Sequence, residues 1–342
     1  GDPLSMTRFT AISFINFLAV LSANGQDSKV FNADSSIYSI GKLEDNIRVG
    51  EWSFFSKNGT LLEKGPYEEG LKEGQWFAYF PNGRVRITGF YKNGKETGEW
   101  VEYFEFSNNE KKQVGKFEEG LRSGQWITYY SNGNVESEVF YKNGLKDGAA
   151  NYYGIYKDLQ IETSYKNDSL NGNWVEYYDN GKVSVRGKYI LDKKDSIWEE
   201  YSYYGQKLLT SNYDNGERVG KWVEYSETGK EIAKYQYQNG LPVGEWQRYY
   251  ENGQLKSITK FESGLASGPY VEYHENGRTS VIGTFTNGLK TGQWSNYHPN
   301  GMLYSRGFYE NDMKTALWRY FNQSGYLTEE GNFEDGQQHG QW

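Results

Sequence analysis

Cysteine is absent from this chain of 342 residues, and histidine occurs only three times. Without cysteine the protein can form no disulfide, no thiol nucleophile and no thiolate metal site. An excess of positive charge is also missing, because the formal net charge is −8. Nucleic-acid backbones and anionic lipids are bound by basic patches, so the charge balance predicts no nucleic-acid partner.

Long hydrophobic runs are missing as well, and the one near the N-terminus, residues 9–21, is too short to cross a bilayer as a helix. It follows Met6 and precedes the small residues Ala23 and Gly25, which is typical of a secretory signal peptide. A disordered apolar tail is the other interpretation, because Asn16 interrupts the run. A signal peptide predicts a periplasmic or secreted protein. The predicted segments are a vector-derived remnant (1–5), a signal peptide (6–25), a linker (26–36) and one continuous array (37–342).

Aromatic residues and glycine are abundant, with 31 tyrosines, 18 phenylalanines, 11 tryptophans and 41 glycines. The tryptophans recur every 24 residues or at twice that interval, apart from one step that is two residues longer. At two positions of this 24-residue period another residue stands in place of tryptophan, Ala150 and Tyr270. We call each position of the period, whichever residue occupies it, the tryptophan slot. Such a period indicates a stacked repeat array, and arrays of this kind are binding surfaces far more often than catalysts. The predicted structural core consists of Trp52, Trp76, Trp100, Trp126, Trp174, Trp198, Trp222, Trp246, Trp294 and Trp318.

One repeat unit, residues 74–91, consists of two strand-like stretches on either side of Asn82 and Gly83. An Asn-Gly pair favours a two-residue type I′ turn, in which both central residues have positive φ. Such a turn would place Phe80 opposite Val85. The unit is therefore predicted to be a β-hairpin whose pairing is determined by the turn.

The same pairing places Trp76 opposite Gly89 and Tyr91 opposite Gly74. Residues that face each other across two paired strands share one side of the sheet. Each large ring would thus face a residue without a side chain, which leaves room for the ring to lie flat across the facing strand. We expect the same arrangement in units such as the one that contains Trp294 and Gly307.

Neighbouring units are joined by a second turn, for example at Asn93 and Gly94. If this turn also has two residues, the tryptophans of successive units stay on the same face. No helical period competes with the strand pattern after residue 36. The predicted fold class is all-β: an elongated single antiparallel sheet, a β-meander of about twelve 24-residue hairpin repeats, twisted and curled because strands twist.

The recurring pattern G-x-W-x-x-Y-Y-x-N-G, followed by G-x-Y-x-N-G, resembles the MORN-repeat variants of bacterial YwqK-like proteins. Residues 98–103, 172–181 and 292–301 carry it, and the resemblance extends over residues 41–342. It implies a repeat fold that serves as an interaction module and has no catalytic residues. Some members carry an antitoxin role, which the predicted signal peptide and the length of this chain disfavour.

No pattern in the sequence predicts catalytic residues, a metal site or a cofactor, so we expect a protein that is not an enzyme. His274 and His298 occupy equivalent slots but lack a third ligand at matching spacing. A row of glutamates recurs two residues after the tryptophan slot. Catalytic pairs need two distinct environments, whereas these positions are equivalent, so a solvated or ring-edge row is expected. The row consists of Glu102, Glu176, Glu200, Glu224 and Glu272.

A second aromatic row follows the tryptophan slot by three residues, which places it on the opposite face of the sheet. Neighbouring side chains can simply cover these rings, or the rings can form a ladder of partly exposed phenols suited to protein contacts or to stacking on sugars. We predict this row as the candidate binding surface: Tyr79, Tyr103, Tyr129, Tyr153, Tyr177, Tyr201, Tyr225, Tyr249, Tyr273 and Tyr297.

Three functions remain open. The first is a protein-binding or scaffold protein of the cell envelope, whose partner is another protein or a second copy of the chain. The second is a module that binds cell-wall glycan or another polysaccharide. The third is an antitoxin or immunity protein.

Overall fold

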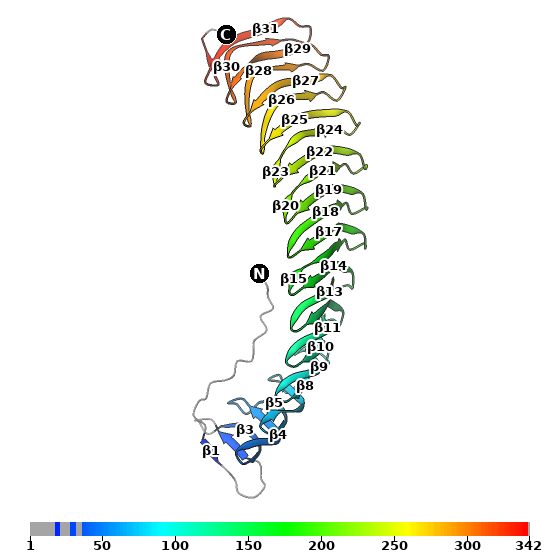
Figure 1. The fold of residues 1–342 in the computed structure, drawn as a ribbon, viewed down its shortest axis with the longest axis vertical. Coiled ribbons are helices and arrows are strands. Elements are labelled where there is room, and N and C mark those ends of the chain that lie inside the picture. Colours follow the sequence, from blue (N-terminus) through cyan, green and yellow to red (C-terminus); the bar gives the residue numbers. More distant parts are fainter. Residues whose placement is uncertain (1–17, 21–27, 32–35, 341–342) are drawn as a thin grey trace. The chain divides into compact units, whose positions relative to one another are not determined.

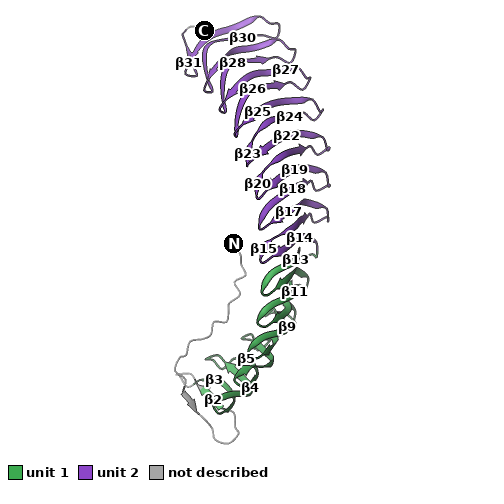
Figure 2. Ribbon diagram, viewed as in Figure 1, with its two compact units in different colours: residues 1–157 green, residues 158–342 purple. Residues whose placement is uncertain are grey.

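The computed structural model describes residues 18–20, 28–31 and 36–340, and every regular element within these ranges is a β-strand. The chain forms two compact units, Gly1–Lys157 and Asp158–Trp342 (Figure 2). In each unit consecutive strands pair antiparallel and lie side by side in chain order (Figure 1). The predicted fold class, an all-β antiparallel meander of hairpin repeats, is confirmed.

The first unit contains strands β1 to β13. In order, these are Leu18–Val20, Ser28–Phe31, Ile37–Glu44, Ile47–Phe55, Leu61–Glu68, Leu71–Lys72, Gly74–Tyr79, Val85–Lys92, Lys95–Tyr103, Lys111–Glu118, Leu121–Tyr129, Val135–Lys142 and Leu145–Tyr153.

The second unit contains strands β14 to β32. In order, these are Leu159–Lys166, Ser169–Leu170, Gly172–Tyr177, Val183–Ile190, Lys193–Tyr201, Lys207–Asp214, Glu217–Arg218, Gly220–Tyr225, Glu231–Gln238, Leu241–Pro242, Gly244–Tyr249, Leu255–Glu262, Leu265–Tyr273, Thr279–Thr286, Leu289–Tyr297, Leu303–Glu310, Met313–Phe321, Leu327–Glu334 and Gln337–His339.

Strand pairing begins near the N-terminus, ahead of the predicted start of the array at residue 37. β1 lies within the predicted signal peptide and pairs with β2, and β2 lies within the predicted linker and pairs with β3. The rest of the predicted signal peptide, residues 6–17 and 21–25, lies outside the described residues, as does the predicted remnant 1–5.

The loop between β7 and β8 is not the predicted type I′ turn. The Gly83 N–H donates to the Phe80 carbonyl at 2.9 Å, and the Phe80 N–H donates to the Arg84 carbonyl at 2.8 Å. Gly83 has a φ of +81°, whereas Asn82 is not among the residues with positive φ. This is a three-residue loop, a type I turn followed by a left-handed glycine. The Asn82 side chain favours it, because its Oδ1 accepts the Arg84 N–H at 3.0 Å.

The different loop changes the pairing only near the turn. Val85 pairs with Tyr79 rather than with Phe80, so that part of the prediction was wrong. A bulge next to Ala78 then compensates for the extra loop residue. Beyond the bulge, Trp76 pairs with Gly89, and Gly74 pairs with Tyr91, as the sequence predicted.

The turns between units are the two-residue turns that were expected. Asn93 and Gly94 have φ values of +48° and +78°, and Lys92 pairs with Lys95 on either side of them. Both central residues are left-handed, which defines a type I′ turn. A bulge at Gly98, where φ is +63°, follows in the next strand and leaves the tryptophans of successive units on one face.

The tryptophan rings lie on glycines, but not on the glycines that face them. Trp76 lies over Gly65 of the preceding strand, where an added β-carbon would come within 2.5 Å of the ring. Gly89 is covered instead by Trp100, whose ring would lie 2.2 Å from such an atom. The indole N–H explains this direction, because that of Trp76 donates to the carbonyl of Pro66, next to Gly65, at 3.0 Å. Register determines which β-carbons are neighbours, whereas the bare glycine, together with this hydrogen bond in most units, determines where the ring turns. Trp294 lies on Gly283 although its N–H donates to Thr291 of its own strand.

The predicted tryptophan core is buried in six of its ten positions. Tyrosine and phenylalanine rings separate the tryptophans edge to face; Tyr91, for example, lies 5.8 Å from Trp76 and 5.2 Å from Trp100. Aromatic pairs favour this geometry. The buried rings are Trp52, Trp76, Trp126, Trp198, Trp294 and Trp318, and the half-buried ones are Trp100, Trp174, Trp222 and Trp246.

Candidate binding surfaces

The predicted tyrosine row lies on the face opposite the tryptophans. Tyr201, for example, donates its hydroxyl to Glu199, the residue directly after Trp198, at 2.9 Å. All ten tyrosines are half-buried, so the row consists of partly exposed phenols. Neighbouring side chains cover the rings: the Arg186 guanidinium lies 5.5 Å from the ring of Tyr201. The binding role of this row stays a prediction.

Charged groups on that face are matched internally. Glu199 accepts hydrogen bonds from Arg186, Lys207 and Tyr201. Burial raises the pKa of the Glu199 carboxyl, but these three donors outweigh it and lower the pKa to about 2. The hydrogen bond that Tyr177 donates to Glu162, together with burial, raises the pKa of the Tyr177 phenol to about 12. These shifts follow from structural pairing within the sheet.

The tryptophan face is organised by two further positions in each unit. We call the residue eleven positions before the tryptophan the backing position, because the ring lies on it. We call the residue four positions before the tryptophan the capping position. Lysine or arginine there places its charge over the ring, for example Lys72 Nζ at 3.8 Å from the centroid of Trp76. Such contacts contribute about 0.5–2 kcal/mol each. The capping cations are Arg48, Lys72, Arg122, Lys194, Arg218, Lys290 and Lys314.

Buried tryptophans all have glycine at the backing position, whereas other residues there accompany less buried rings. Trp198 on Gly187 and Trp318 on Gly307 are 2 % and 1 % exposed. Four units of the second compact unit depart from the rule, and their residues at the tryptophan slot, Trp174, Trp222, Trp246 and Tyr270, are half-buried. Their backing residues are Thr163, Ser211, Tyr235 and Thr259. A side chain at this position prevents the ring from lying flat on the backbone.

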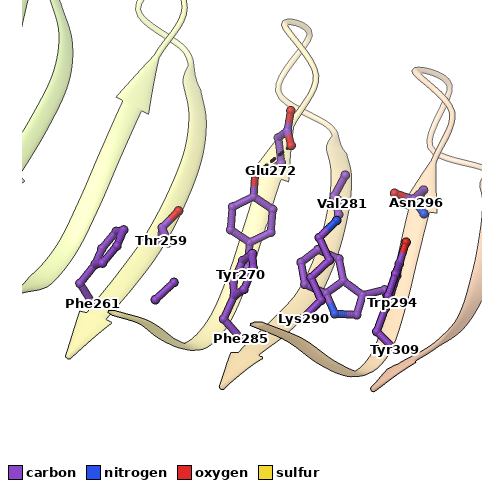
Figure 3. Close-up of a pocket in the computed structure, with 11 residues that line it drawn as sticks. Thr259, Phe261, Tyr270, Glu272, Val281, Phe285, Lys290, Trp294, Asn296 and Tyr309 are labelled. Carbon is purple, nitrogen blue, oxygen red and sulfur yellow. Dashed lines mark hydrogen bonds between the residues drawn. The ribbon is translucent and has the colours of Figure 1, made fainter. Parts of the chain in front are cut away.

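Two hollows open on the tryptophan face where the backing residue is not glycine. They have volumes of about 390 and 260 Å³, and both are lined by Thr259, Phe261 and Tyr270. Figure 3 shows the larger hollow, in which the Tyr270 hydroxyl points to Glu272 and donates to it at 2.9 Å. Burial and this hydrogen bond raise the pKa of Tyr270. The phenol therefore stays protonated at neutral pH. Trp246 and Arg248 line the smaller hollow.

The hairpin loops between paired strands tie successive units together. The Asn300 side-chain amide donates to the carbonyl of Gln323, in the next loop, at 2.8 Å. The two histidines considered in the sequence occupy this edge, and their Nε2 atoms bond to main-chain carbonyls of the next unit, His274 to Tyr297 at 2.8 Å and His298 to Phe321 at 2.9 Å. Their role in these contacts is structural.

An exposed row of aliphatic side chains follows the turns between units, which the sequence interpretation missed. Each member comes directly after a type I′ turn, and six of the eight pack against the glycine of the next such turn; an added β-carbon at Gly264, for example, would lie 3.3 Å from Leu241. The members are 39–51 % exposed. The recurring Asn-Gly-Leu was the available signal. We call this row the aliphatic ridge: Ile47, Leu71, Leu121 and Leu145 in the first unit, and Leu241, Leu265, Leu289 and Met313 in the second.

Within residues 18–20, 28–31 and 36–340 there is no cluster of three or more histidine, aspartate or glutamate side chains arranged to hold a metal ion. The same ranges contain no helix with the length and apolarity needed to cross a membrane.

Sequence comparison matches six hairpins of the array to the family described as MORN repeat variant. These six hairpins are MORN repeats. The matched segments are 48–69, 72–93, 122–143, 170–190, 242–262 and 290–311. Each begins at the capping position and ends at or directly before the following turn between units, so one MORN repeat is one hairpin. No curated protein matches the sequence.

Solved structures similar to the chain include complexes of TcdB2-TccC3. The crystal structure of TcdB2-TccC3-Cdc42 is 11% identical with a TM-score of 0.16, and the match covers 94% of this chain and 23% of that one. TcdB2-TccC3 alone is 12% identical with a TM-score of 0.17, covering 93% and 24%. The Tc holotoxin pore of Photorhabdus luminescens is 13% identical with a TM-score of 0.14, covering 93% and 22%. The MORN chain thus spans less than a quarter of these proteins.

Proposed function

We propose that this MORN-repeat protein is a non-enzymatic scaffold of the cell envelope, which assembles with a second copy of its own chain along the aliphatic ridge. A repeat array of this kind suggests a binding or scaffold role. The finer resemblance to bacterial YwqK-like proteins supports the same role. The observation that carries the proposal is the regular exposure of the ridge.

The spacing of the ridge favours a second copy as the partner. Consecutive ridge residues lie two strands apart, which corresponds to about 9.6 Å. Leu241, Leu265, Leu289 and Met313 occupy four consecutive units. A second copy has the same spacing, so each ridge residue meets an equivalent one, as in an isologous interface. An unrelated surface would match this interval at only one or two positions.

The energetics require several ridge residues to act together. Leu265 is 50 % exposed and Leu289 is 39 % exposed. Burying the exposed half of one such side chain contributes about 1 kcal/mol. Association costs several kcal/mol of translational and rotational freedom, so one or two contacts are insufficient and a row is needed.

Two of the charged side chains beside the ridge are paired within the chain. Glu262, three residues before Leu265, pairs with Lys260 at 2.9 Å. Asp312, next to Met313, accepts the Lys290 N–H at 2.7 Å. These contacts limit the charge repulsion between two ridges that approach each other.

Internal pairing of carboxylates also supports a role without catalysis. Glu176 accepts the indole N–H of Trp174 at 3.0 Å, and Glu63 pairs with Lys72 at 3.1 Å. Carboxylates held in this way act as partners of neighbouring side chains, and Glu176 is a ring-edge partner of the kind that the sequence suggested.

Sedimentation velocity over a wide range of concentrations tests the assembly. The wild-type chain should form dimers, and Leu265→Glu with Leu289→Glu should remain monomeric, because two buried charges would face each other. Ile282→Glu with Phe308→Glu is the matched control, since these residues are 43 % and 44 % exposed but lie within β27 and β29 rather than directly after a turn between units. A wild-type chain that stays monomeric, or a ridge variant that dimerises normally, contradicts the proposal.

Cell fractionation tests the location separately. A tagged chain that begins at Met6 should appear in the periplasmic or secreted fraction of a bacterial host. The same chain without residues 6–25 should stay in the cytoplasm. Retention of the longer chain in the cytoplasm would exclude the envelope and leave the self-assembly test unaffected.

A further inference from the structure

The two hollows on the tryptophan face have the properties of a ligand site that the scaffold role does not explain. They occur where three features change together: the backing residue, the capping residue and the depth at which the ring is buried. A change in one of these would be an ordinary repeat variation. The three features also change in the unit of Trp174, which has Thr163 at the backing position and Leu170 at the capping position. At Trp246 and Tyr270 they change in two consecutive units, and both hollows lie there.

The backing residues keep these two rings off the main chain. Trp246 lies against the ring of Tyr235, with centroids 4.5 Å apart, instead of lying on a glycine. Thr259 lines both hollows at the backing position of Tyr270. As a result, both rings are half-buried, whereas Trp294 in the next unit is 2 % exposed.

The capping residues leave the outer faces of the same rings without a cation. Lys290 lies 4.7 Å from the centroid of Trp294, and Lys314 lies 4.4 Å from that of Trp318. At the equivalent positions the chain has Pro242 before Trp246 and Ala266 before Tyr270. The negative face of an aromatic ring attracts a cation or the weakly positive C–H groups of a ligand. Tyr235 and Phe261 each lie 4.5 Å from Trp246, so a ligand would contact the part of the Trp246 ring that they leave exposed, together with Tyr270.

The charges around the hollows select the kind of ligand. Arg248 lines the smaller hollow, and Lys290 and Glu272 line the larger one, so two cations stand against one carboxylate. A cationic ligand would be repelled by Arg248 and Lys290, and an anionic one would meet Glu272. A purely apolar ligand would leave these polar groups facing it unpaired. A neutral molecule with many hydroxyls and C–H faces matches both the rings and their polar edges.

We propose that the two hollows bind a neutral oligosaccharide, with sugar rings against Tyr270 and Trp246 and sugar hydroxyls on Glu272 and Arg248. Tyr270 belongs to both hollows, so one chain of sugars can contact both. The hydrogen bond from the Tyr270 hydroxyl to Glu272 holds both groups in position before the ligand arrives. This site is separate from the aliphatic ridge, because its residues face the tryptophan side of the sheet.

Isothermal titration with cellohexaose and with chitohexaose tests the proposal. At least one of them should bind to the wild-type chain. The informative variant is Ala266→Lys, which introduces the capping residue that neighbouring units have and therefore keeps the fold of a regular unit. It should weaken binding about tenfold, as expected when one aromatic stacking contact is lost. Ser267→Lys adds the same charge one residue further on, off the ring, and should bind as the wild type does.

Variants of Tyr270 test whether the ring itself contacts the ligand. Tyr270→Ala should weaken binding about tenfold as well, whereas Tyr270→Phe keeps the ring and should retain most of the affinity. The proposal is overturned if neither oligosaccharide binds, or if Ala266→Lys binds as tightly as the wild type. Binding of pentalysine or of an aliphatic peptide in place of both sugars would also overturn it and would assign the hollows to a protein partner.

Discussion

Replacing Gly187 by alanine tests the central packing rule of this array. The new β-carbon would lie 2.1 Å from the ring of Trp198, so the indole must move away. That ring is 2 % exposed, its N–H donates to the Lys188 carbonyl at 3.2 Å, and Lys194 lies 4.2 Å from its centroid. The hydrogen bond and the cation contact contribute about 1 kcal/mol each, and overpacking costs about 1–3 kcal/mol. We expect a loss of about 3 kcal/mol in the stability of this hairpin.

Hydrogen exchange followed by mass spectrometry measures this loss locally, which suits an array whose units can open separately. Amides in peptides that cover residues 183–201 should exchange about a hundredfold faster. The control is Ser211→Ala at the backing position of the next unit, where Trp222 is already half-buried; it should change the local stability by less than about 1 kcal/mol. Ser211→Gly should instead make the Trp222 ring less accessible to a fluorescence quencher. Unchanged exchange in Gly187→Ala would show that the ring does not depend on a bare backbone position.

Three further predictions concern single contacts. Lys194→Met removes the charge over a tryptophan ring but keeps an apolar stem, and it should lower local stability by about 1 kcal/mol in hydrogen exchange; the exposed neighbour in Lys193→Met should have little effect. Glu199→Gln should destabilise the protein at neutral pH, because the carboxyl has a pKa of about 2 in the folded chain against an ordinary value of 4.5. That stabilisation is complete above about pH 4.5 and is lost as the pH falls towards 2. The stabilities of the wild type and Glu199→Gln, measured by denaturant titration, should therefore converge at low pH. A stability difference independent of pH would show that the charge of Glu199 is not its cause. Asn300→Ala removes the bond to the Gln323 carbonyl at 2.8 Å and should speed amide exchange in that loop by about tenfold, with no change two units away.

Most of the strand pairing follows from the sequence. Because side chains alternate along a strand, the 24-residue period and the turn residues together determine which positions face each other. The pairing of Trp76 with Gly89 was predicted on this basis and is confirmed. The loop at Asn82 was predicted wrongly because an Asn-Gly pair fits both a two-residue and a three-residue loop, and only the hydrogen bonds of the folded chain select one.

The candidate sites depended more on tertiary structure. The sequence placed the tyrosine row on the correct face, but the exposure of a ring depends on neighbouring side chains such as Arg186, which pattern alone does not provide. The aliphatic ridge was visible as a recurring residue after the turn, yet its exposure required the folded array. The hollows could not be predicted from the sequence. They arise from the residues eleven and four positions before Tyr270, which come together only when adjacent strands pair.

The sequence by itself therefore determined the repeat, the strands and the two faces, because these depend on local periodicity. The folded structure decided where each ring lies and which rings remain open to a ligand. The physical reason is that an indole turns to the preceding strand, where its N–H finds a main-chain carbonyl and its flat face finds a glycine. That choice depends on residues of two strands at once, such as Gly65 and Trp76.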